Sequence, residues 1–325
     1  MTEAMQSYTA PYTLGIDIGG TKVMGGVVAD DGQVLASSRY PTPSDDVVEA
    51  VEVIGKIAAE LGAEYPLASM GIAIAGYVDT SRSVLQHSPN LPWGDDVPLQ
   101  RLVSEVVDIP VVLENDGNAA AWGEYRFGAG VGASNLVLIG VGTGIASGFV
   151  MEGRLYRGSF GKAAELGHLL SVRDGEPCGC GSRGCLERYA SGTALERYAR
   201  EAAAADPVGG ARLVELAGGD LAALEGAQVQ QAATEGNTVA RAAFAEVAGW
   251  LGIAFADVVF ALDPDLIVVG GGVSEAGDLL LSPAIAAYRQ VVASRGRTAP
   301  YAEIALATLG NTAGLVGAAD LARIQ

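Results

Sequence analysis

The chain has 325 residues, half of them hydrophobic, and its 38 acidic against 20 basic residues give a net charge of −18 at pH 7. This negative charge disfavours nucleic acids and anionic membrane surfaces as partners, because both are themselves negatively charged. The chain is longer than one compact core usually holds, so we expect two lobes. Residues 1–12 carry neither the basic start nor the apolar run of a secretion signal, which favours a cytoplasmic location.

The first part of the chain alternates apolar runs, turns and a helical pattern. Apolar runs bounded by turn residues predict strands at residues 13–18, 22–29, 33–39, 69–75 and 110–113. A helical period of apolar residues spans about residues 45–61. Because strands and helices alternate, the predicted class is α/β.

Residues 127–151 form an uncharged stretch that is long enough to cross a membrane. Glycines and polar residues interrupt it, however, and its truly apolar part, residues 136–139, has only the length of a strand. We therefore expect a buried strand that leads into a glycine loop.

The second half of the chain opens with an echo of the first. A strand, a glycine turn, a second strand and an acidic-glycine turn follow one another over residues 15–35, and the same order recurs over residues 138–155. An echo this short can also arise by chance, but it favours two lobes that begin with the same unit. We expect lobes at residues 13–125 and 126–310, with a C-terminal helix over residues 311–325 that packs back on the first lobe.

Downstream of the echo, the chain is rich in alanine and helical in pattern. Helices are predicted at residues 191–205, 206–217, 235–261 and 312–324. A strand at residues 266–269 runs directly into Gly270, Gly271 and Gly272.

All three cysteines of the chain, Cys178, Cys180 and Cys185, lie within eight residues of one another. The first of them follows His168 by ten residues. Three thiolates and one imidazole suit a tetrahedral Zn²⁺ ion, and the intervening glycines let the backbone bend around it. The alternative is a set of unrelated buried thiols, or a disulfide with one cysteine left over. With all four positions filled by protein, such a zinc is structural rather than catalytic.

Two glycine turns each follow an apolar strand and offer bare backbone N–H groups with a threonine hydroxyl, which suits phosphate. The first comprises Gly19, Gly20 and Thr21, and the second comprises Gly142, Thr143 and Gly144. Neither fits a Walker A or Rossmann motif, and a single glycine hairpin is more often a plain turn. The presence of two, with Asp17 before the first as a candidate for water-mediated Mg²⁺ binding, favours phosphate binding.

Asn115 and Asp116 end a predicted strand and precede a helix, at the carboxyl edge where α/β sheets bind ligands. Asp116 could equally be an N-cap. Two further acids, Glu165 and Glu187, flank the predicted zinc loop over residues 165–187. With Asn90, Asn115 and His168 they form a candidate set for binding vicinal hydroxyls.

These motifs, in this order, resemble the repressor, open-reading-frame and kinase (ROK) family of sugar kinases over almost the whole chain. The resemblance is carried by residues 17–22, 115–120, 142–144, 165–168, 178–187 and 270–273. It implies a two-lobed actin/hexokinase-like ATPase fold built from ribonuclease-H-like lobes, with a small zinc knuckle. It also implies ATP-dependent phosphorylation of glucose to glucose 6-phosphate, with Mg²⁺ and a structural Zn²⁺.

The resemblance assigns roles to individual residues of this chain. Asp116 is expected to be the general base. The hexose would be bound by Asn90, Asn115, Asp116, Glu165, His168 and Glu187. ATP and its metal would be bound by Asp17, Gly19, Gly20, Thr21, Lys22, Gly142, Thr143, Gly144, Gly270, Gly271 and Gly272, while His168, Cys178, Cys180 and Cys185 would hold zinc.

Several alternatives stay open at this stage. The acceptor could be mannose, fructose or an N-acetylated amino sugar, and polyphosphate could serve as an additional donor. A sugar-sensing repressor of the same family would need a DNA-binding domain, for which there is no room before residue 17. An actin-like polymer gives no reason for a zinc knuckle beside two acids. We expect a homodimer or homotetramer.

Two segments depart from the pattern common in the family. Ala146 and Ser147 stand where a glycine pair is usual after the second turn. Lys162, Ala163 and Ala164 stand where small residues with a glycine are common before Glu165, and Lys162 could contact an extended anionic donor.

Overall fold

The computed structural model describes residues 12–43, 46–89, 91–297, 299 and 301–324. The chain divides into two compact units. The first comprises Met1–Phe127, Arg157–Lys162 and Thr312–Gln325, and the second comprises Gly128–Tyr156 and Ala163–Asn311. The segment Arg157–Lys162, which we expected within the second lobe, thus packs with the first unit.

The first unit is built on a five-stranded sheet with the order β3-β2-β1-β4-β7. Its strands are β1 (Tyr12–Ile18), β2 (Lys22–Val28), β3 (Val34–Pro41), β4 (Leu67–Ile74) and β7 (Val111–Asn115). The first three are antiparallel neighbours, while β4 and β7 run parallel to β1. A small pair, β5 (Tyr77–Val78) with β6 (Leu85–His87), lies outside this sheet.

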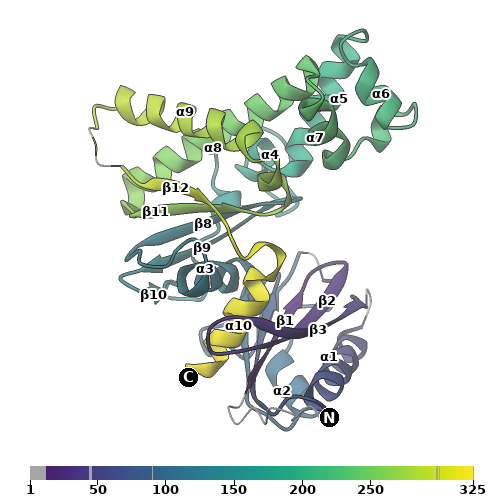
Figure 1. Ribbon diagram of the computed structural model, residues 1–325, viewed down its shortest axis with the longest axis vertical. Helices are drawn as coiled ribbons and strands as arrows, with labels where there is room; N and C mark the ends of the chain where they lie inside the picture. The colour runs from purple at the N-terminus through teal and green to yellow at the C-terminus, as the bar shows by residue number, and fades with distance from the viewer. Residues whose placement is uncertain (1–11, 44–45, 90, 298, 300, 325) are drawn as a thin grey trace, which may run out of the picture. The chain divides into compact units, whose positions relative to one another are not determined.

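Helices α1 (Val47–Gly62), α2 (Leu99–Ser104), α3 (Asp116–Phe127) and α10 (Ala313–Arg323) complete the first unit. The side chain of Asp46 accepts a hydrogen bond from the N–H of Val48 and caps α1, whose apolar face fills the core beside β2 and β3. The yellow helix α10 packs against β1, β4 and α3 (Figure 1). A Cβ at Gly71 of β4 would stand 1.8 Å from the carbonyl oxygen of Ala318, so only glycine lets α10 approach so closely.

The second unit repeats this plan with the sheet order β10-β9-β8-β11-β12. Its strands are β8 (Leu136–Val141), β9 (Ile145–Met151), β10 (Arg154–Leu155), β11 (Leu266–Gly270) and β12 (Glu303–Leu306). Again the first three are antiparallel, and the last two run parallel to the first. The echo in the sequence therefore marks a repeated structural unit, and the uncharged stretch at residues 127–151 contains β8, a glycine turn and β9.

The second unit holds most of the helices. They are α4 (Glu187–Ala190), α5 (Gly192–Ala205), α6 (Ala211–Leu216), α7 (Gly226–Thr234), α8 (Thr238–Leu262) and α9 (Asp278–Ser294). Short 3₁₀ turns are η1 (Leu166–His168), η2 (Leu221–Ala223) and η3 (Gly272–Ala276), and η4 (Gly310–Thr312) precedes α10. Among the described residues, α8 alone is long and apolar enough to cross a membrane, but half of its most apolar window is buried, and it packs against α5 and α9.

Three predicted helices need correction at their ends, and several elements were not predicted. Helix α6 covers only part of residues 206–217, because Pro207, Gly209 and Gly210 form a turn in which Asp206 accepts from Gly209 N–H. Helix α8 begins at Thr238, capped by Asn237, rather than at residue 235, and α10 ends at Arg323. Helices α2, α4, α7 and α9 and strands β5, β6 and β12 were absent from the prediction.

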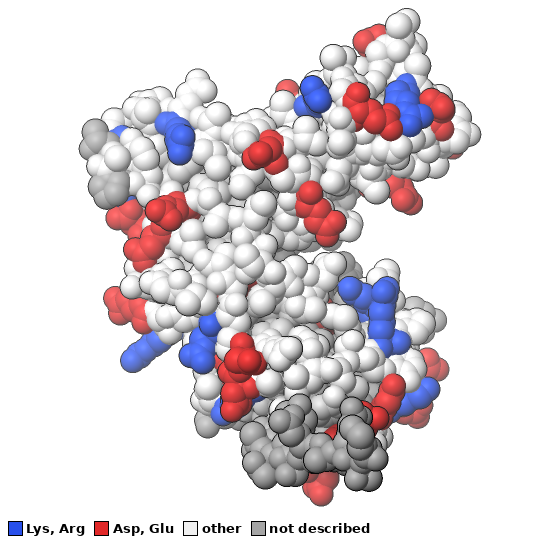
Figure 2. Space-filling view, in the orientation of Figure 1, with Lys and Arg blue, Asp and Glu red and all other residues white. Residues whose placement is uncertain are grey.

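Charged side chains do not gather on the face shown in Figure 2. Acidic and basic groups are interspersed there, with uncharged surface between them. That face lacks the continuous basic area typical of proteins that bind nucleic acids.

Candidate functional site

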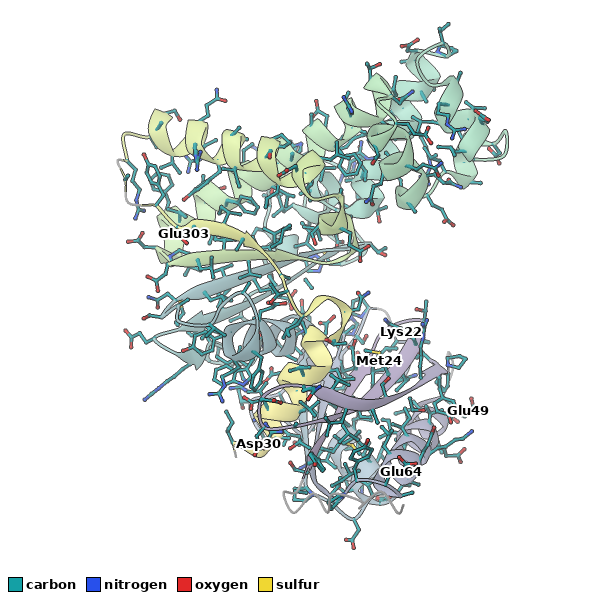
Figure 3. All side chains as sticks on the ribbon, in the orientation of Figure 1. Lys22, Met24, Asp30, Glu49, Glu64 and Glu303 are labelled. Carbon is teal, nitrogen blue, oxygen red and sulfur yellow. The ribbon has the colours of Figure 1, made fainter. Side chains whose placement is uncertain are left out.

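In the first unit, the turn between β1 and β2 lies at the end of the sheet where Asp17 is found. The N–H of Gly19 donates to the carbonyl of Lys22 at 3.0 Å, which closes the turn. The Thr42 hydroxyl donates to the carbonyl of Gly19 at 2.6 Å, a contact that the sequence did not predict. Lys22, labelled in Figure 3, is the first residue of β2 and so lies at the end of the strand that carries the turn.

The Asp17 carboxylate is partly accessible to water yet surrounded by protein atoms. The pKa of Asp17 is raised to about 6, first by desolvation and then by the negative charge of Asp116, while the positive charge of Lys22 opposes the shift. A cation beside Asp17 would offset both the desolvation and the repulsion from Asp116, so this residue fits a role near Mg²⁺.

The Asn115–Asp116 pair lies at the junction of β7 and α3. The Asn115 side chain accepts from the N–H of Asn118 at 3.0 Å and donates to the carbonyl of Gly76 and to Asp116 Oδ1, each at 3.1 Å. Asn115 therefore makes the capping bond to α3, the role that was considered for Asp116. Its amide is occupied by protein partners.

Asp116 is the first residue of α3, and its Oδ1 accepts from the N–H of Gly117 at 2.9 Å as well as from Asn115. Burial raises the pKa of Asp116, and the hydrogen bonds from these neighbours oppose that shift. A carboxylate with a raised pKa accepts a proton more readily, so the surroundings of Asp116 suit a general base.

A buried ion pair lies directly beside this junction. Glu114 Oε2 accepts from Arg157 Nε at 2.6 Å, and Arg82 Nε is 3.6 Å away. These three residues were not predicted from the sequence. The available signal was an acidic residue at the end of an apolar strand, which needs a partner once buried.

In the second unit, the turn between β8 and β9 holds Gly142, Thr143 and Gly144. The N–H of Gly142 donates to the carbonyl of Gly144 at 3.0 Å. The first two residues of α5 hydrogen-bond to this turn. The N–H of Gly192 donates to the carbonyl of Gly142 at 2.7 Å, and the Thr193 hydroxyl donates to the carbonyl of Thr143 at 2.6 Å. The backbone amides needed for phosphate are thus set in a braced turn.

Glu187 connects this turn to the cysteine cluster. Its Oε2 accepts from the N–H of Ile145 at 3.2 Å, and its Oε1 is 3.5 Å from the sulfur of Cys178. Glu165 immediately precedes η1 and lies three residues before His168 in the chain. The structure describes Asp17, Asn115 and Asp116 in the first unit and Glu165, His168 and Glu187 in the second, while Asn90 lies outside the described residues.

The cluster of His168, Cys178, Cys180 and Cys185 has the geometry of a metal site. The four ligand atoms all lie within 4.8 Å of one another. Cys178 Sγ is 3.7 Å from His168 Nδ1, and Cys180 Sγ is 3.7 Å from Cys185 Sγ. Zn–S bonds of about 2.3 Å in a tetrahedron put sulfurs about 3.8 Å apart, so the donor set fits zinc. All three cysteines are free thiols, which excludes the disulfide alternative.

The triple glycine begins with Gly270, the last residue of β11. Strand β11 is paired with β8, which leads into the second turn. Gly271 has a φ of 82°, and a Cβ there would stand 2.6 Å from the carbonyl oxygen of Val141. The backbone itself therefore requires this glycine. Around Gly272 there is open space, so Gly272 is the position at which a ligand contact can be tested.

Known proteins resemble this chain in both sequence and architecture. A sequence model of the ROK family matches residues 13–325. The chain is 45% identical over 317 residues to a glucokinase of Streptomyces coelicolor, covering 96% of this chain and 97% of that protein.

Among solved structures, a ROK family glucokinase from Streptomyces griseus in complex with glucose and AMPPNP is 44% identical, with a TM-score of 0.88, and the match covers 97% of this chain and all of that one. A ROK hexokinase from Thermus thermophilus is 34% identical with a TM-score of 0.79, covering 96% of this chain and 98% of that one. These matches confirm the expected two-lobed kinase fold. The chain therefore belongs to the ROK family.

Proposed function

We propose that this protein is a glucokinase that transfers the γ-phosphoryl group of ATP to the primary hydroxyl of glucose. The observation that carries this proposal is the likeness over nearly the whole chain to a glucokinase structure that holds both glucose and AMPPNP, an ATP analogue. The residues discussed above supply what phosphoryl transfer needs, which is positioning, charge stabilisation and a proton acceptor.

Asp116 accepts the proton of the attacking hydroxyl. Support comes from its raised pKa and from the hydrogen bonds that orient its carboxylate. Asn115 acts by orienting Asp116, because its side-chain amide is occupied by Gly76 and Asp116. It was expected to bind sugar directly, and this arrangement favours the orienting role.

The backbone amides of the two glycine turns bind the phosphate tail, and the region of Gly270, Gly271 and Gly272 lies beside the adenosine. Lys22 supplies a positive charge at the end of the first turn. Asp17 would hold Mg²⁺ through water, and the ion would supply positive charge to offset the charge on the phosphates. Lys162 lies over the ring of Tyr77, with its Nζ 5.6 Å from the ring centre, so no role in donor binding is assigned to it.

The hexose is bound by Glu165, Glu187 and the free nitrogen of His168, together with Asn90. Nδ1 of His168 faces Cys178, which leaves Nε2 to donate to a sugar hydroxyl when Nδ1 binds metal. His168 and the three cysteines would hold the zinc, which would stiffen the loop that bears Glu165 and Glu187.

A panel of acceptors and donors tests the proposal. Purified protein is assayed with glucose, mannose, fructose, N-acetylglucosamine and N-acetylmannosamine, each with ATP or polyphosphate and Mg²⁺. We expect the highest kcat/KM for glucose with ATP, because a site built to pair hydroxyls discriminates against analogues that leave its groups unpaired. A higher kcat/KM for an N-acetylated sugar would reject the acceptor assignment, and faster turnover with polyphosphate would reject the donor assignment.

Two further proposals concern the whole protein. We propose that the protein is located in the cytoplasm and that it forms a homodimer or homotetramer. Light scattering on the purified chain measures the assembly directly.

A further inference from the structure

Glu114 is a buried acid that the proposed reaction does not use. It is the fourth residue of β7, and its side chain is only 3% exposed. It directly precedes the Asn115–Asp116 pair in the chain. A buried carboxylate needs charge partners and hydrogen bonds, because desolvation of an unpaired charge is costly.

Each oxygen of Glu114 has a separate task. Oε1 accepts from the backbone N–H of Asn115 and from Asn118 Nδ2, both at 3.1 Å. Oε2 accepts from Arg157 Nε at 2.6 Å and lies 3.6 Å from Arg82 Nε. The carboxylate therefore joins the junction of β7 and α3 on one side to two guanidinium groups on the other.

The hydrogen bonds continue from this junction to Asp116. Asn118 N–H donates to the Asn115 side chain, and Asn115 Nδ2 donates to Asp116 Oδ1. The orientation of Asp116 thus depends on a turn whose first backbone N–H is held by Glu114. A shift of about 1 Å in such a group can lower a rate about 100-fold.

Arg157 makes the shorter of the two contacts to Glu114, and it comes from an unexpected part of the chain. It directly follows Tyr156 of the second unit, yet the segment Arg157–Lys162 packs with the first unit. The same segment is anchored at Gly161, where a Cβ would stand 2.4 Å from the carbonyl oxygen of Val78. A short segment that interrupts the second unit in sequence therefore carries the main counter-charge of Glu114.

We infer that Arg157 is a positioning residue for Asp116: by neutralising Glu114 it keeps the Asn115–Asp116 turn in the geometry that proton transfer requires. The inference rests on the proposed role of Asp116 as base. Without Arg157, the buried carboxylate of Glu114 draws in water or turns toward Arg82, and either movement releases the N–H of Asn115.

Substitution of Arg157 by Met, with an Arg323→Met control, tests the inference. Arg323 is 22% exposed and pairs at 3.2 Å with Asp320, a carboxylate that is 1% exposed in the same unit. Arg157 is 26% exposed and pairs with a carboxylate that is 3% exposed. Asp320 retains Arg126 after the control substitution, as Glu114 retains Arg82. Arg323 also pairs with Asp30 and donates to the carbonyls of Val28 and Ala29. The control therefore removes a comparable ion pair and further contacts besides, none of which touches the Asp116 turn.

We expect Arg157→Met to lower kcat about 10- to 100-fold with less than about a threefold change in glucose KM, and Arg323→Met to leave kcat within about twofold. The hydrogen bond from Asn115 favours the ionised form of Asp116, so weakening this bond in Arg157→Met should raise the pKa of Asp116. The acidic limb of the kcat–pH profile should therefore move to higher pH. Arg157→Lys retains the charge and should recover part of kcat; it also serves if Arg157→Met does not fold.

The double variant Glu114→Gln/Arg157→Met removes both charges, while the new amide oxygen can still accept from the N–H of Asn115. It should have a higher kcat than Arg157→Met alone. Equal kcat losses in Arg157→Met and Arg323→Met, or an unmoved acidic limb, would overturn the inference. Asp116→Asn is measured in parallel. If it retains more than about a tenth of kcat, the base assignment fails together with this inference; if it is inactive and Arg157→Met matches its control, only the inference fails.

Discussion

The hydroxyl of Ser147 donates a hydrogen bond to the backbone carbonyl of Ala164. The same oxygen accepts from the N–H of Leu166 at 3.1 Å, so one buried side chain holds the backbone on both sides of Glu165. Ser147 and Ala164 both lie in segments that depart from the common family pattern. Ala164 has a φ of 70°, a region that favours glycine, and the bonds of Ser147 help to hold it there.

Ser147→Ala should therefore destabilise the protein and weaken glucose binding. Two buried backbone groups lose their partner, which costs about 1–3 kcal/mol in the free energy of unfolding. Denaturant titration and glucose KM measure the two effects. Ser294→Ala is the control, because that exposed hydroxyl only bonds to the carbonyl of Val291, and we expect a change within about 0.5 kcal/mol. An unchanged glucose KM in a destabilised Ser147→Ala would show that the Glu165 segment does not depend on this bond.

Asp116→Asn should lower kcat by about two to four orders of magnitude, with a smaller change in glucose KM, because the amide cannot accept the hydroxyl proton. Steady-state kinetics on folded protein measures the loss. Asp220→Asn is the control, because Asp220 is a capping aspartate that accepts from the N–H of Ala222, and it should leave kcat unchanged. A loss under tenfold would reduce Asp116 to a structural residue.

Metal analysis should find about one zinc per chain, and Cys180→Ser should lower that content and the activity with it. The expected cause is the loss of one ligand from a four-ligand set that shapes the loop of Glu165 and Glu187. Elemental analysis of protein purified without chelators measures the stoichiometry, and circular dichroism of the variant monitors the remaining fold. Metal-free wild-type protein with full activity would contradict this.

Asp17 should make the metal-free protein less stable as the pH rises. The pKa of Asp17 is about 6 in the folded protein, compared with an ordinary value of 3.8. The folded state therefore binds this proton more tightly than the unfolded state, and the free energy of unfolding falls as the pH rises from about 4 to about 6. Relative to wild type, Asp17→Asn should gain about 1–3 kcal/mol in unfolding free energy at pH 7.5 compared with pH 4, the lower end allowing for partial solvation.

Chemical denaturation in Mg²⁺-free buffer across this pH range measures the gain. Glu64→Gln, at an exposed acid of the same unit, removes the same charge and should show no such pH dependence. A pH-independent difference between Asp17→Asn and wild type would mean that Asp17 is solvated like an ordinary surface acid.

Gly144→Ala and Gly142→Ala should separate the two roles of the second turn. A Cβ at Gly144 would stand 2.1 Å from Glu187 Oε2, whereas a Cβ at Gly142 meets nothing within 4 Å. Gly144→Ala must displace Glu187 and should raise glucose KM roughly 10-fold or more, the scale of one lost charged hydrogen bond. Gly142→Ala should leave glucose KM within about twofold. Equal glucose KM values in the two variants would exclude Glu187 from the hexose site.

Local signals in the sequence predicted much of the fold and of the site. The strands around Asp17 and Asn115 follow from apolar runs bounded by turn residues, and the metal cluster follows from three cysteines in eight residues. The repeated strand–turn–strand unit was visible because both copies keep glycines where the backbone turns. Each of these features is encoded within about twenty neighbouring residues.

Features that depend on distant contacts could not be predicted. Glu114 and Arg157 are 43 positions apart, and nothing local marks either as a partner of the other. Helix α9 contains Pro283 in its second turn and has no side-chain cap, so its pattern does not predict a helix, and it is stabilised by packing on α8. In the sequence, Ser147 and Ala164 were visible only as two separate departures from the common family pattern, and the hydrogen bond between them could not be predicted.

The close contact of α10 with Gly71 has a consequence for how the protein is made. The first unit needs Thr312–Gln325 to cover β1 and β4, but its other main segment ends at Phe127. At about 5–20 residues per second, a ribosome takes roughly 10–40 s to translate the intervening residues 128–311. During that interval the nascent first unit exposes the apolar face that α10 later covers, and transiently exposed apolar surface of this kind makes an incompletely folded chain prone to aggregation.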